Sequence, residues 1–231
     1  MPETQLADEC KAEIARYLHA LSSSLPAQID TRKLSRERPP ILATWARETL
    51  RWRFTELAQD ALEKLNAKRF ASAILLTRAA VETTATLWHL NTQIREALTS
   101  RNIEKLEALL KRVVFGERLS DTPEELMALN VLTTLKHVEK TVPGTLRYYQ
   151  ELCEYSHPNY LGTTGLYSAP HKNTGVVELG SNIRGANSHN EICATALSAT
   201  MRMFHPVYAA IGDSLPALVE LCETSIPPNQ K

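Results

Sequence analysis

Residues 67–100 read AKRFASAILLTRAAVETTATLWHLNTQIREALTS, and this stretch decides the fold class. Apolar residues recur along it every three or four positions, which is the spacing of one buried helical face. A second apolar set covers another face, so the first half of the helix is apolar nearly all round. Such a helix lies centrally in a bundle. The two sets are Ala73, Leu76, Ala80, Leu87, Ile94 and Leu98, and Phe70, Ile74, Val81 and Trp88.

The same spacing predicts further helices around the central one. A strong helix start, with a capping residue, a proline and two acids, lies at Asp121 to Glu125, and its helix should end at Pro143. The last helix should be kinked or divided by Pro206 and Pro216. The other predicted helices are Thr4 to Leu25, Ile41 to Asn66, Ile103 to Phe115 and Asn187 to Glu223.

The stretch from Tyr148 to Gly165 reads YYQELCEYSHPNYLGTTG, a helical run that Pro158 stops. After it, Gly165 to Ser168 and Gly175 to Gly180 are β-prone pieces that predict a small hairpin. We therefore expect an all-α protein, a multi-helix bundle with a small β-hairpin inserted before the last long helix.

A chain of 231 residues is long enough to bury a core without disulfides or metals, and we expect a single helical domain over residues 1–231. Its parts are an N-terminal helix and basic linker (1–40), a core bundle (41–158), a loop and β-hairpin (159–187) and a kinked C-terminal helix (188–223).

The composition favours a cytoplasmic protein with no membrane partner. A formal net charge of zero gives no global attraction to nucleic acids or membrane surfaces. The four cysteines lie far apart with no C-x-x-C pair, as is typical of a reduced cytosolic protein. The N-terminus has no signal-peptide pattern, and no apolar run approaches the ~20 residues that span a bilayer.

Several common catalytic classes lack their motifs in this sequence. There is no P-loop, no dinucleotide-binding glycine pattern, no H-E-x-x-H and no G-x-S-x-G. The seven histidines are scattered singly, without the paired spacing of metal ligands. We therefore expect neither a metal site nor a cofactor.

A basic stretch runs from Asp30 to Phe54. It contains seven basic residues against three acidic ones, with Trp45 and Trp52 among them. It is either a solvated linker that leads into a helix or an edge that contacts nucleic-acid phosphates.

Arg78 and Glu82 lie four residues apart on the central helix and therefore share one face. Charges on a central helix should be paired, because an unpaired buried ion is costly. The two residues form either an internal ion pair that tethers neighbouring helices or part of a polar site inside the bundle.

His157 follows Tyr155 and Ser156 at the end of a helix, and Asn159 comes just after Pro158. A histidine in this place either caps the helix or acts on a substrate, by giving a proton to a leaving oxygen or by holding a phosphate. Asn159 and Gly162 suit a tight polar turn beside it.

Arg184 and His189 form a second pattern at the start of the last helix. Their spacing sets a guanidinium, which suits phosphate charge, close to an imidazole that transfers protons. The same two residue types also occur at this spacing by chance.

Two motifs carry a resemblance to a known family. They are LLTRAAVET at Leu75 to Thr83 and Y-x-E-L-x-E-Y-S-H-P-N-Y-x-G at Tyr149 to Gly162. With these motifs the chain resembles uncharacterised prokaryotic helical proteins near the HEPN superfamily and its DUF5677-like relatives, over roughly residues 40 to 215. The resemblance implies a helical bundle that is commonly dimeric. Many HEPN proteins are metal-independent ribonucleases of toxin, phage-defence or CRISPR systems, and others serve binding or assembly.

The HEPN signature is an arginine, usually a polar residue next, and a histidine four to six residues after the arginine. His157 matches the histidine, but Leu152 stands five residues before it in place of arginine. Arg184 and His189 have the signature spacing, with Gly185 where a polar residue is usual.

The resemblance leads to a hypothesis of a homodimeric, metal-independent ribonuclease of a toxin or defence system. In it, His157 is the general acid or base, Arg78 and Arg147 stabilise the phosphate, and Glu82 orients them. Residues expected to bind RNA or another ligand are Tyr155, Ser156, Asn159, Arg184 and His189.

Two other functions remain open from the sequence. One is a non-catalytic binding or assembly module with a cognate protein or a nucleotide as its partner. In that module Arg78, Glu82 and His157 form a structural polar network. The other is a nucleic-acid binder that uses the edge from Arg32 to Arg53.

Overall fold

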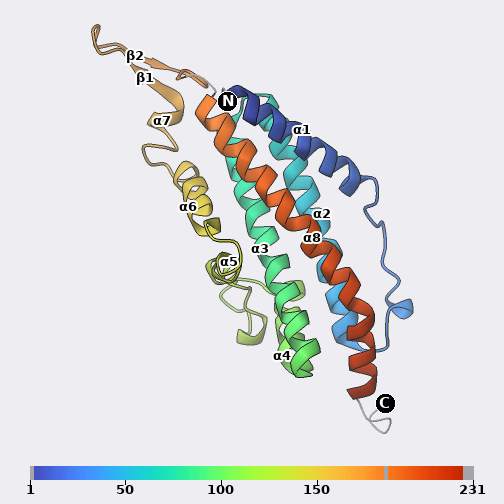
Figure 1. Cartoon of the computed structure of the whole chain (residues 1–231). Coiled ribbons are helices and arrows are strands. Elements are labelled where there is room, and N and C mark those ends of the chain that lie inside the picture. The colour runs from blue at the N-terminus through green and yellow to red at the C-terminus, as the bar shows by residue number, and fades with distance from the viewer. Residues whose placement is uncertain (1–2, 185–186, 226–231) are drawn as a thin grey trace.

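The computed structural model describes residues 3–184 and 187–225, and it confirms the predicted all-α bundle with a β-hairpin before the last long helix (Figure 1). None of the described helices is both long and apolar enough to cross a membrane. The helices are α1 (Glu3–Ser22), α2 (Arg38–Asn66), α3 (Phe70–Ser100), α4 (Ile103–Phe115), α5 (Val131–Glu139), α6 (Thr145–Ser156), α7 (Thr164–Tyr167) and α8 (Asn187–Ser225). Short 3₁₀ turns cover Thr31–Lys33 and Glu124–Leu126, and the strands are β1 (Ser168–Pro170) and β2 (Val177–Leu179).

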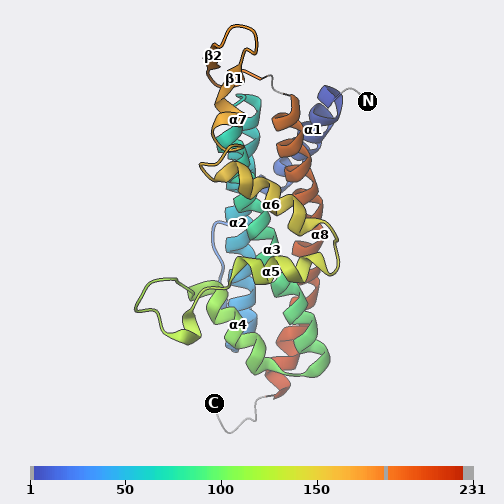
Figure 2. The ribbon, with the colours of Figure 1, turned by 90° about the vertical axis from the view of Figure 1, so that its left-hand side faces the viewer.

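The helix α3 is central, as its sequence predicts. It packs against α2 and α8 on one side and against α5 and α6 on the other. The two short helices α5 and α6 run across it, while α2 and α8 run along it (Figure 2). From Leu76 to Asn91 no residue of α3 is exposed.

Threonines take part in this burial without leaving hydroxyl groups unsatisfied. The hydroxyls of Thr83 and Thr84 donate to the carbonyl oxygens of Ala79 and Ala80, at 2.8 and 2.9 Å. A buried hydroxyl with such a partner costs little free energy, so these polar residues fit inside the bundle.

The main core lies between α2, α3 and α8. At its centre Phe54 of α2 stacks on Phe204 of α8, with ring centroids 3.9 Å apart and planes 6° apart, and neither ring is exposed. A second cluster holds the short helices, where Leu135 of α5 and Leu152 of α6 join Ile74 of α3. Burial on both sides of α3 therefore fixes the positions of α5 and α6.

The helix predicted from Asp121 onward begins later than expected. The segment forms only the turn Glu124–Leu126, and α5 begins at Val131 after Asn130, whose side chain accepts from the Leu132 amide at 2.9 Å. Backbone hydrogen bonds from the Glu117 amide to the Leu126 carbonyl, and from the Ala128 amide back to Glu117, hold the chain extended there. The local capping sequence is thereby overridden.

The helix α8 was expected to be kinked or divided at its prolines. It is one element from Asn187 to Ser225, with Pro206 and Pro216 inside it, so of the two expected outcomes the division does not occur. Both prolines are exposed, and water can therefore satisfy the carbonyl groups that lose an intrahelical partner.

The hairpin is present, but its first strand is displaced. The predicted strand Gly165 to Ser168 is mostly the short helix α7, which buries Leu166, and β1 begins at Ser168. Ser168 pairs with Leu179 in the antiparallel register of β1 and β2. The apolar side chain of Leu166 joins the second core cluster, which accounts for the turn of helix.

Two histidines predicted as isolated residues meet where α5 crosses α3. The rings of His89 and His137 lie 4.6 Å apart. Burial, followed by the charges of His137 and Lys105, lowers the pKa of His89 to about 4. The Nδ1 atom of His89 is buried without a hydrogen-bond partner among the described residues.

We predict that His89 makes the protein less stable as the pH falls from about 6.5 to about 4. In this window the unfolded chain, with an ordinary histidine pKa near 6.5, binds a proton that the folded state resists. Above the window both states are neutral at this residue, so it contributes no pH dependence. The free energy of unfolding, measured with urea at pH 7.0 and at pH 4.5, should fall less between the two in His89→Gln than in the wild type. His19→Gln, at an exposed site on α1, should leave the loss unchanged.

We predict that Phe204→Ala lowers the free energy of unfolding by about 3–5 kcal/mol, because it removes a fully buried ring and leaves a cavity against Phe54. Urea unfolding followed by far-UV circular dichroism measures the change. Phe115→Ala is the matched control, since its ring is 42% exposed, and it should cost about 1 kcal/mol or less. Equal losses in the two variants would contradict the assigned core.

Candidate functional site

Most of the predicted site residues lie at one end of the bundle. The end of α6, the loop after it, α7, the hairpin and the first turn of α8 gather there (Figure 1). This end brings His189 of α8 against Tyr155 of α6, with ring centroids 5.5 Å apart and planes 89° apart. Residues from two distant parts of the sequence therefore share one site.

His189 is half-buried in an aromatic setting. Besides Tyr155, its ring faces Phe70 at the start of α3, with centroids 6.0 Å apart. Burial, and then the positive charge of Arg184, lowers the pKa of His189 below its ordinary value. A neutral imidazole near pH 7 can accept a proton.

Arg184 is exposed and held in place by two hydrogen bonds. Its Nε donates to the carbonyl oxygen of Ser168, and its Nη1 donates to the hydroxyl of Tyr160 at 3.2 Å. No described residue bonds to its remaining terminal nitrogen, Nη2. A fixed guanidinium with a free donor is suited to an anionic oxygen.

His157 caps α6 with an exposed side chain that makes no hydrogen bond, ion pair or ring contact with the described residues. It lies two residues after Tyr155, and therefore at the same end of the bundle as His189. A Cβ at Gly162 would lie 1.9 Å from the His157 carbonyl oxygen, so the loop can pass this close to the His157 backbone only with glycine at position 162. The imidazole is left free to meet a substrate.

Ser156 and Asn159 shape the loop around His157. The Ser156 hydroxyl donates to the carbonyl oxygen of Leu152 at 2.7 Å. Asn159 accepts from the Gly162 amide at 3.0 Å and donates to Glu154 at 2.7 Å. Both polar groups are thereby used within the loop, and neither has its full hydrogen-bonding capacity left for a ligand.

Arg78 and Glu82 form a polar cluster with Tyr149, elsewhere on α3 and α6. The Tyr149 hydroxyl donates to Glu82 Oε1 at 2.7 Å and accepts from Arg78 Nη2 at 3.2 Å, and Arg78 Nε lies 3.3 Å from Glu82 Oε1. Burial, together with the hydrogen bond to Glu82, raises the pKa of Tyr149 to about 12 against the lowering effect of Arg78. The hydroxyl therefore stays protonated as the donor.

His157 is not part of this cluster. It follows Tyr149 by eight residues, about 12 Å along a helix. Arg147 lies on the first turn of α6 in an exposed ion pair with Glu151, at 3.2 Å, and is farther still from the end of the helix. The structure does not bring Arg78, Glu82 or Arg147 to His157. The polar network expected of Arg78, Glu82 and His157 contains Tyr149 in place of His157.

Sequence reasoning missed three residues: one in the cluster of Arg78 and Glu82, and two beside His189 and Arg184 at the hairpin end of the bundle. In the sequence, Tyr149 and Tyr160 stand only as positions of a motif and Phe70 only as an apolar residue of the central helix, with no site role for any of them. A tyrosine can have a mainly buried ring and a hydroxyl that serves a polar network, and helical spacing reports only the burial.

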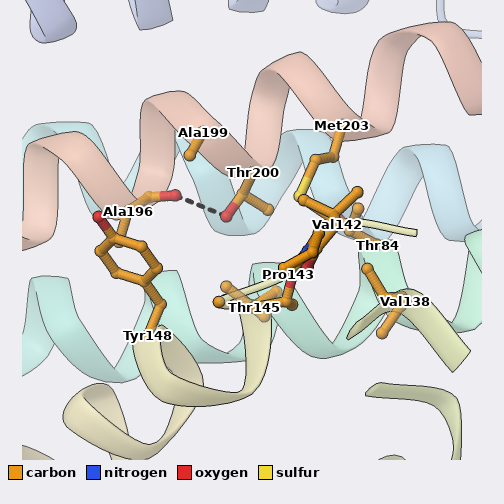
Figure 3. Close-up of a pocket in the computed structure, with 13 residues that line it drawn as sticks. Thr84, Val138, Val142, Pro143, Thr145, Tyr148, Ala196, Ala199, Thr200 and Met203 are labelled. Carbon is orange, nitrogen blue, oxygen red and sulfur yellow. Dashed lines mark hydrogen bonds between the residues drawn. The ribbon is translucent and has the colours of Figure 1, made fainter. Parts of the chain in front are cut away.

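An apolar pocket lies between α3, α8 and the turn before α6 (Figure 3). It encloses about 110 Å³ and is lined by residues such as Val81, Val138 and Met203. Its threonine hydroxyls are turned to backbone, as in the hydrogen bond from Thr200 to the Ala196 carbonyl oxygen at 2.6 Å. Apart from the phenol of Tyr148, the described lining offers no acid or base for a reaction.

Among the described residues, no group of three or more histidine, cysteine, aspartate or glutamate side chains is arranged to hold a metal ion. Comparison of the chain with protein-family models, curated proteins and solved structures finds no match. The HEPN resemblance therefore stays a prediction, and function has to be inferred from the residues of the site.

We predict that Tyr149→Phe lowers the free energy of unfolding by about 1–2 kcal/mol, because Glu82 loses a hydrogen-bond donor and Arg78 an acceptor. His157→Ala is the control, since its side chain touches neither cluster, and it should change stability by no more than about 0.5 kcal/mol. Urea unfolding of both variants and the wild type gives the comparison. A large loss in His157→Ala with none in Tyr149→Phe would contradict the arrangement.

Proposed function

We propose that the protein is a metal-independent ribonuclease of the HEPN kind, acting in a prokaryotic toxin or defence system, with its site at the hairpin end of the bundle. The observation that supports this is that His189, packed against Tyr155, and Arg184, held by Ser168 and Tyr160 with a terminal nitrogen that no described residue binds, lie at the same end of the bundle. The two residues also have the HEPN spacing.

In the proposed reaction, neutral His189 takes the proton of a ribose 2′-hydroxyl as its oxygen attacks the neighbouring phosphorus. Arg184 stabilises the charge that develops on the phosphate oxygens. The bond from phosphorus to the 5′-oxygen breaks, and His157 donates a proton to that oxygen. The products are a 2′,3′-cyclic phosphate and a 5′-hydroxyl, so protons and bonds balance without a metal.

Arg184 suits the phosphate role better than Arg78 or Arg147 does. Arg78 is already bound to Tyr149 and paired with Glu82, and Arg147 is paired with Glu151 away from the histidines. An arginine that must leave an existing ion pair offers less net stabilisation to a new charge.

Exposed tyrosines near Arg184 support RNA as the substrate. Tyr160, whose hydroxyl accepts from Arg184, is 59% exposed, and Tyr167 next to β1 is also exposed. Bases of a single strand stack on such rings whatever their sequence. The exposed rings therefore offer places for the nucleotides on either side of the cleaved bond.

We predict that the protein cleaves single-stranded RNA in the presence of EDTA and leaves the same sequence of DNA intact. Arg184→Ala and His189→Gln should each lower the single-turnover rate by about 10²–10⁴-fold. His157→Ala should lower it also, whereas Arg147→Ala, which removes an exposed arginine far from the histidines, should cleave at the wild-type rate. Gel analysis of a labelled oligonucleotide measures the rates, and circular dichroism checks that the variants fold.

Cleavage by Arg184→Ala and His189→Gln at the wild-type rate would contradict the proposed site. Cleavage that EDTA abolishes would contradict the mechanism. Folded wild-type protein that cleaves no RNA would favour the second candidate function below.

The second candidate is a non-catalytic binding or assembly module with a protein partner. Exposed large apolar side chains along the segment from the end of α4 to the start of α5 favour it, since such side chains often mark an interface. These side chains are Phe115, Leu119, Met127 and Leu132. The homodimer expected from the HEPN resemblance is part of either proposal, and sedimentation equilibrium tests it.

A further inference from the structure

The loop after α1 forms a pocket against the first half of α2. Residues Pro26 to Thr31 lie over Trp45 and Trp52, and the pocket between them measures about 370 Å³. The two tryptophans are seven residues apart, which places them on one helical face about 10 Å from each other along the axis. The first half of α2 belongs to the end of the bundle opposite the hairpin (Figure 1).

Both tryptophans are exposed, at 41% and 47%, yet neither is loose. The ring of Trp45 meets Phe115 of α4 edge to face, with centroids 5.5 Å apart. The indole nitrogen of Trp52 donates to the Pro26 carbonyl oxygen at 2.8 Å. Two fixed aromatic surfaces lose little conformational entropy when a ligand binds between them.

Glu48 lies between the tryptophans on α2 and is the only charged residue among the described residues that line the pocket. Its carboxylate accepts from the Tyr208 hydroxyl at 2.8 and 2.9 Å, and it pairs with Arg47 and with Arg51. Burial, and then the hydrogen bond to Glu48, raises the pKa of Tyr208, which keeps its hydroxyl a donor.

Two arginines pair with Glu48, so the one carboxylate in the lining is neutralised, and this charge balance bears on the ligand class. Arg51 is buried with Glu48, and it also donates to the Leu21 carbonyl oxygen at 2.8 Å, so it cannot turn away from the cluster. This balance disfavours a quaternary ammonium ion, the usual ligand of aromatic cages. It favours a flat aromatic ligand that carries negative charge.

Further positive charge lies at the edge of the pocket. Arg32 and Lys33 directly follow the loop, and their side chains are almost fully exposed apart from ion pairs with Asp30 at 3.3 and 3.7 Å. Because Arg32 and Lys33 carry two positive charges against the one negative charge of Asp30, the three side chains together keep a net positive charge toward the solvent.

We propose that this pocket binds a nucleobase, with its ring between Trp45 and Trp52 and its phosphate toward Arg32 and Lys33. Base stacking on aromatic side chains supplies the main attraction, and the basic residues supply the attraction for phosphate. The base belongs either to a free nucleotide or to a single strand of RNA, and both sources present the same chemistry. The site is separate from the proposed ribonuclease site and does not depend on it.

Tryptophan fluorescence tests the site directly, because the chain has three tryptophans and two of them line the pocket. AMP and GMP should quench the wild-type emission in a saturable way, and ribose 5-phosphate, which lacks a base, should not. Trp45→Leu and Trp52→Leu should each weaken binding about tenfold or more. Trp88→Phe, on the partly buried side of α3, is the matched control and should bind as the wild type does.

The two sources of the base give different titrations. A pentanucleotide of RNA that binds no more tightly than AMP or GMP supports a free nucleotide. A pentanucleotide that binds at least tenfold more tightly, with the same loss in Trp45→Leu, supports a strand. Circular dichroism and thermal melting check each variant. Trp52→Phe, which keeps an aromatic ring, replaces Trp52→Leu if the loop unfolds, and it should bind more weakly than the wild type.

Three results would overturn the proposal. They are the absence of saturable quenching by any of the base-containing probes, equal binding of ribose 5-phosphate, and unchanged affinity in folded tryptophan variants. If the first of these results is found and a dimer dissociates in Trp45→Leu, the pocket is assigned to an interface between two copies. Because AMP and GMP contain no phosphodiester bond to cleave, failure of their binding leaves the ribonuclease proposal untouched, and the reverse also holds.

Discussion

The burial of α3 on every side is the constraint on which the rest of the structure depends. A helix whose residues from Leu76 to Asn91 are all buried or partly buried needs partners on opposite faces, and α2 and α8 on one side cannot supply both. The short helices α5 and α6 cover the remaining face (Figure 2). Burial of the apolar area of α3 therefore fixes the position of α6 in space, and with it the position of the loop that carries His157.

Polar groups in this bundle are used in two different ways. Glu82 and Arg78 are closed into a cluster with Tyr149, and Glu48 with Arg51 and Tyr208, so their charges hold neighbouring helices together. Arg184 and His157, in contrast, lie at the hairpin end of the bundle with nitrogen atoms that no described residue binds. A closed cluster supports the positions of the helices, and only the open groups are available to a ligand.

The sequence anticipated the central helix, the hairpin and the last long helix, because burial over several turns leaves a repeating apolar pattern. It misplaced the start of α5, since the backbone hydrogen bonds between Glu117 and Ala128 outweigh the local helix-start signal at Asp121. It also allowed a division at Pro206 and Pro216 that does not occur, because their exposed positions let the helix continue. Local propensity is a weak term wherever a distant partner competes for the same backbone groups.

For the candidate site, the sequence by itself determined which residues carry suitable chemistry: His157, His189, Arg78, Arg147 and Arg184 are in the chain whatever its fold. It also determined that Arg78 and Glu82 share a face, because four residues make about one turn of helix. Only the tertiary structure decided that Tyr149 completes their cluster and that Tyr155 meets His189. These contacts join residues dozens of positions apart, and they depend on how α6 and α8 pack around α3, which no local spacing records.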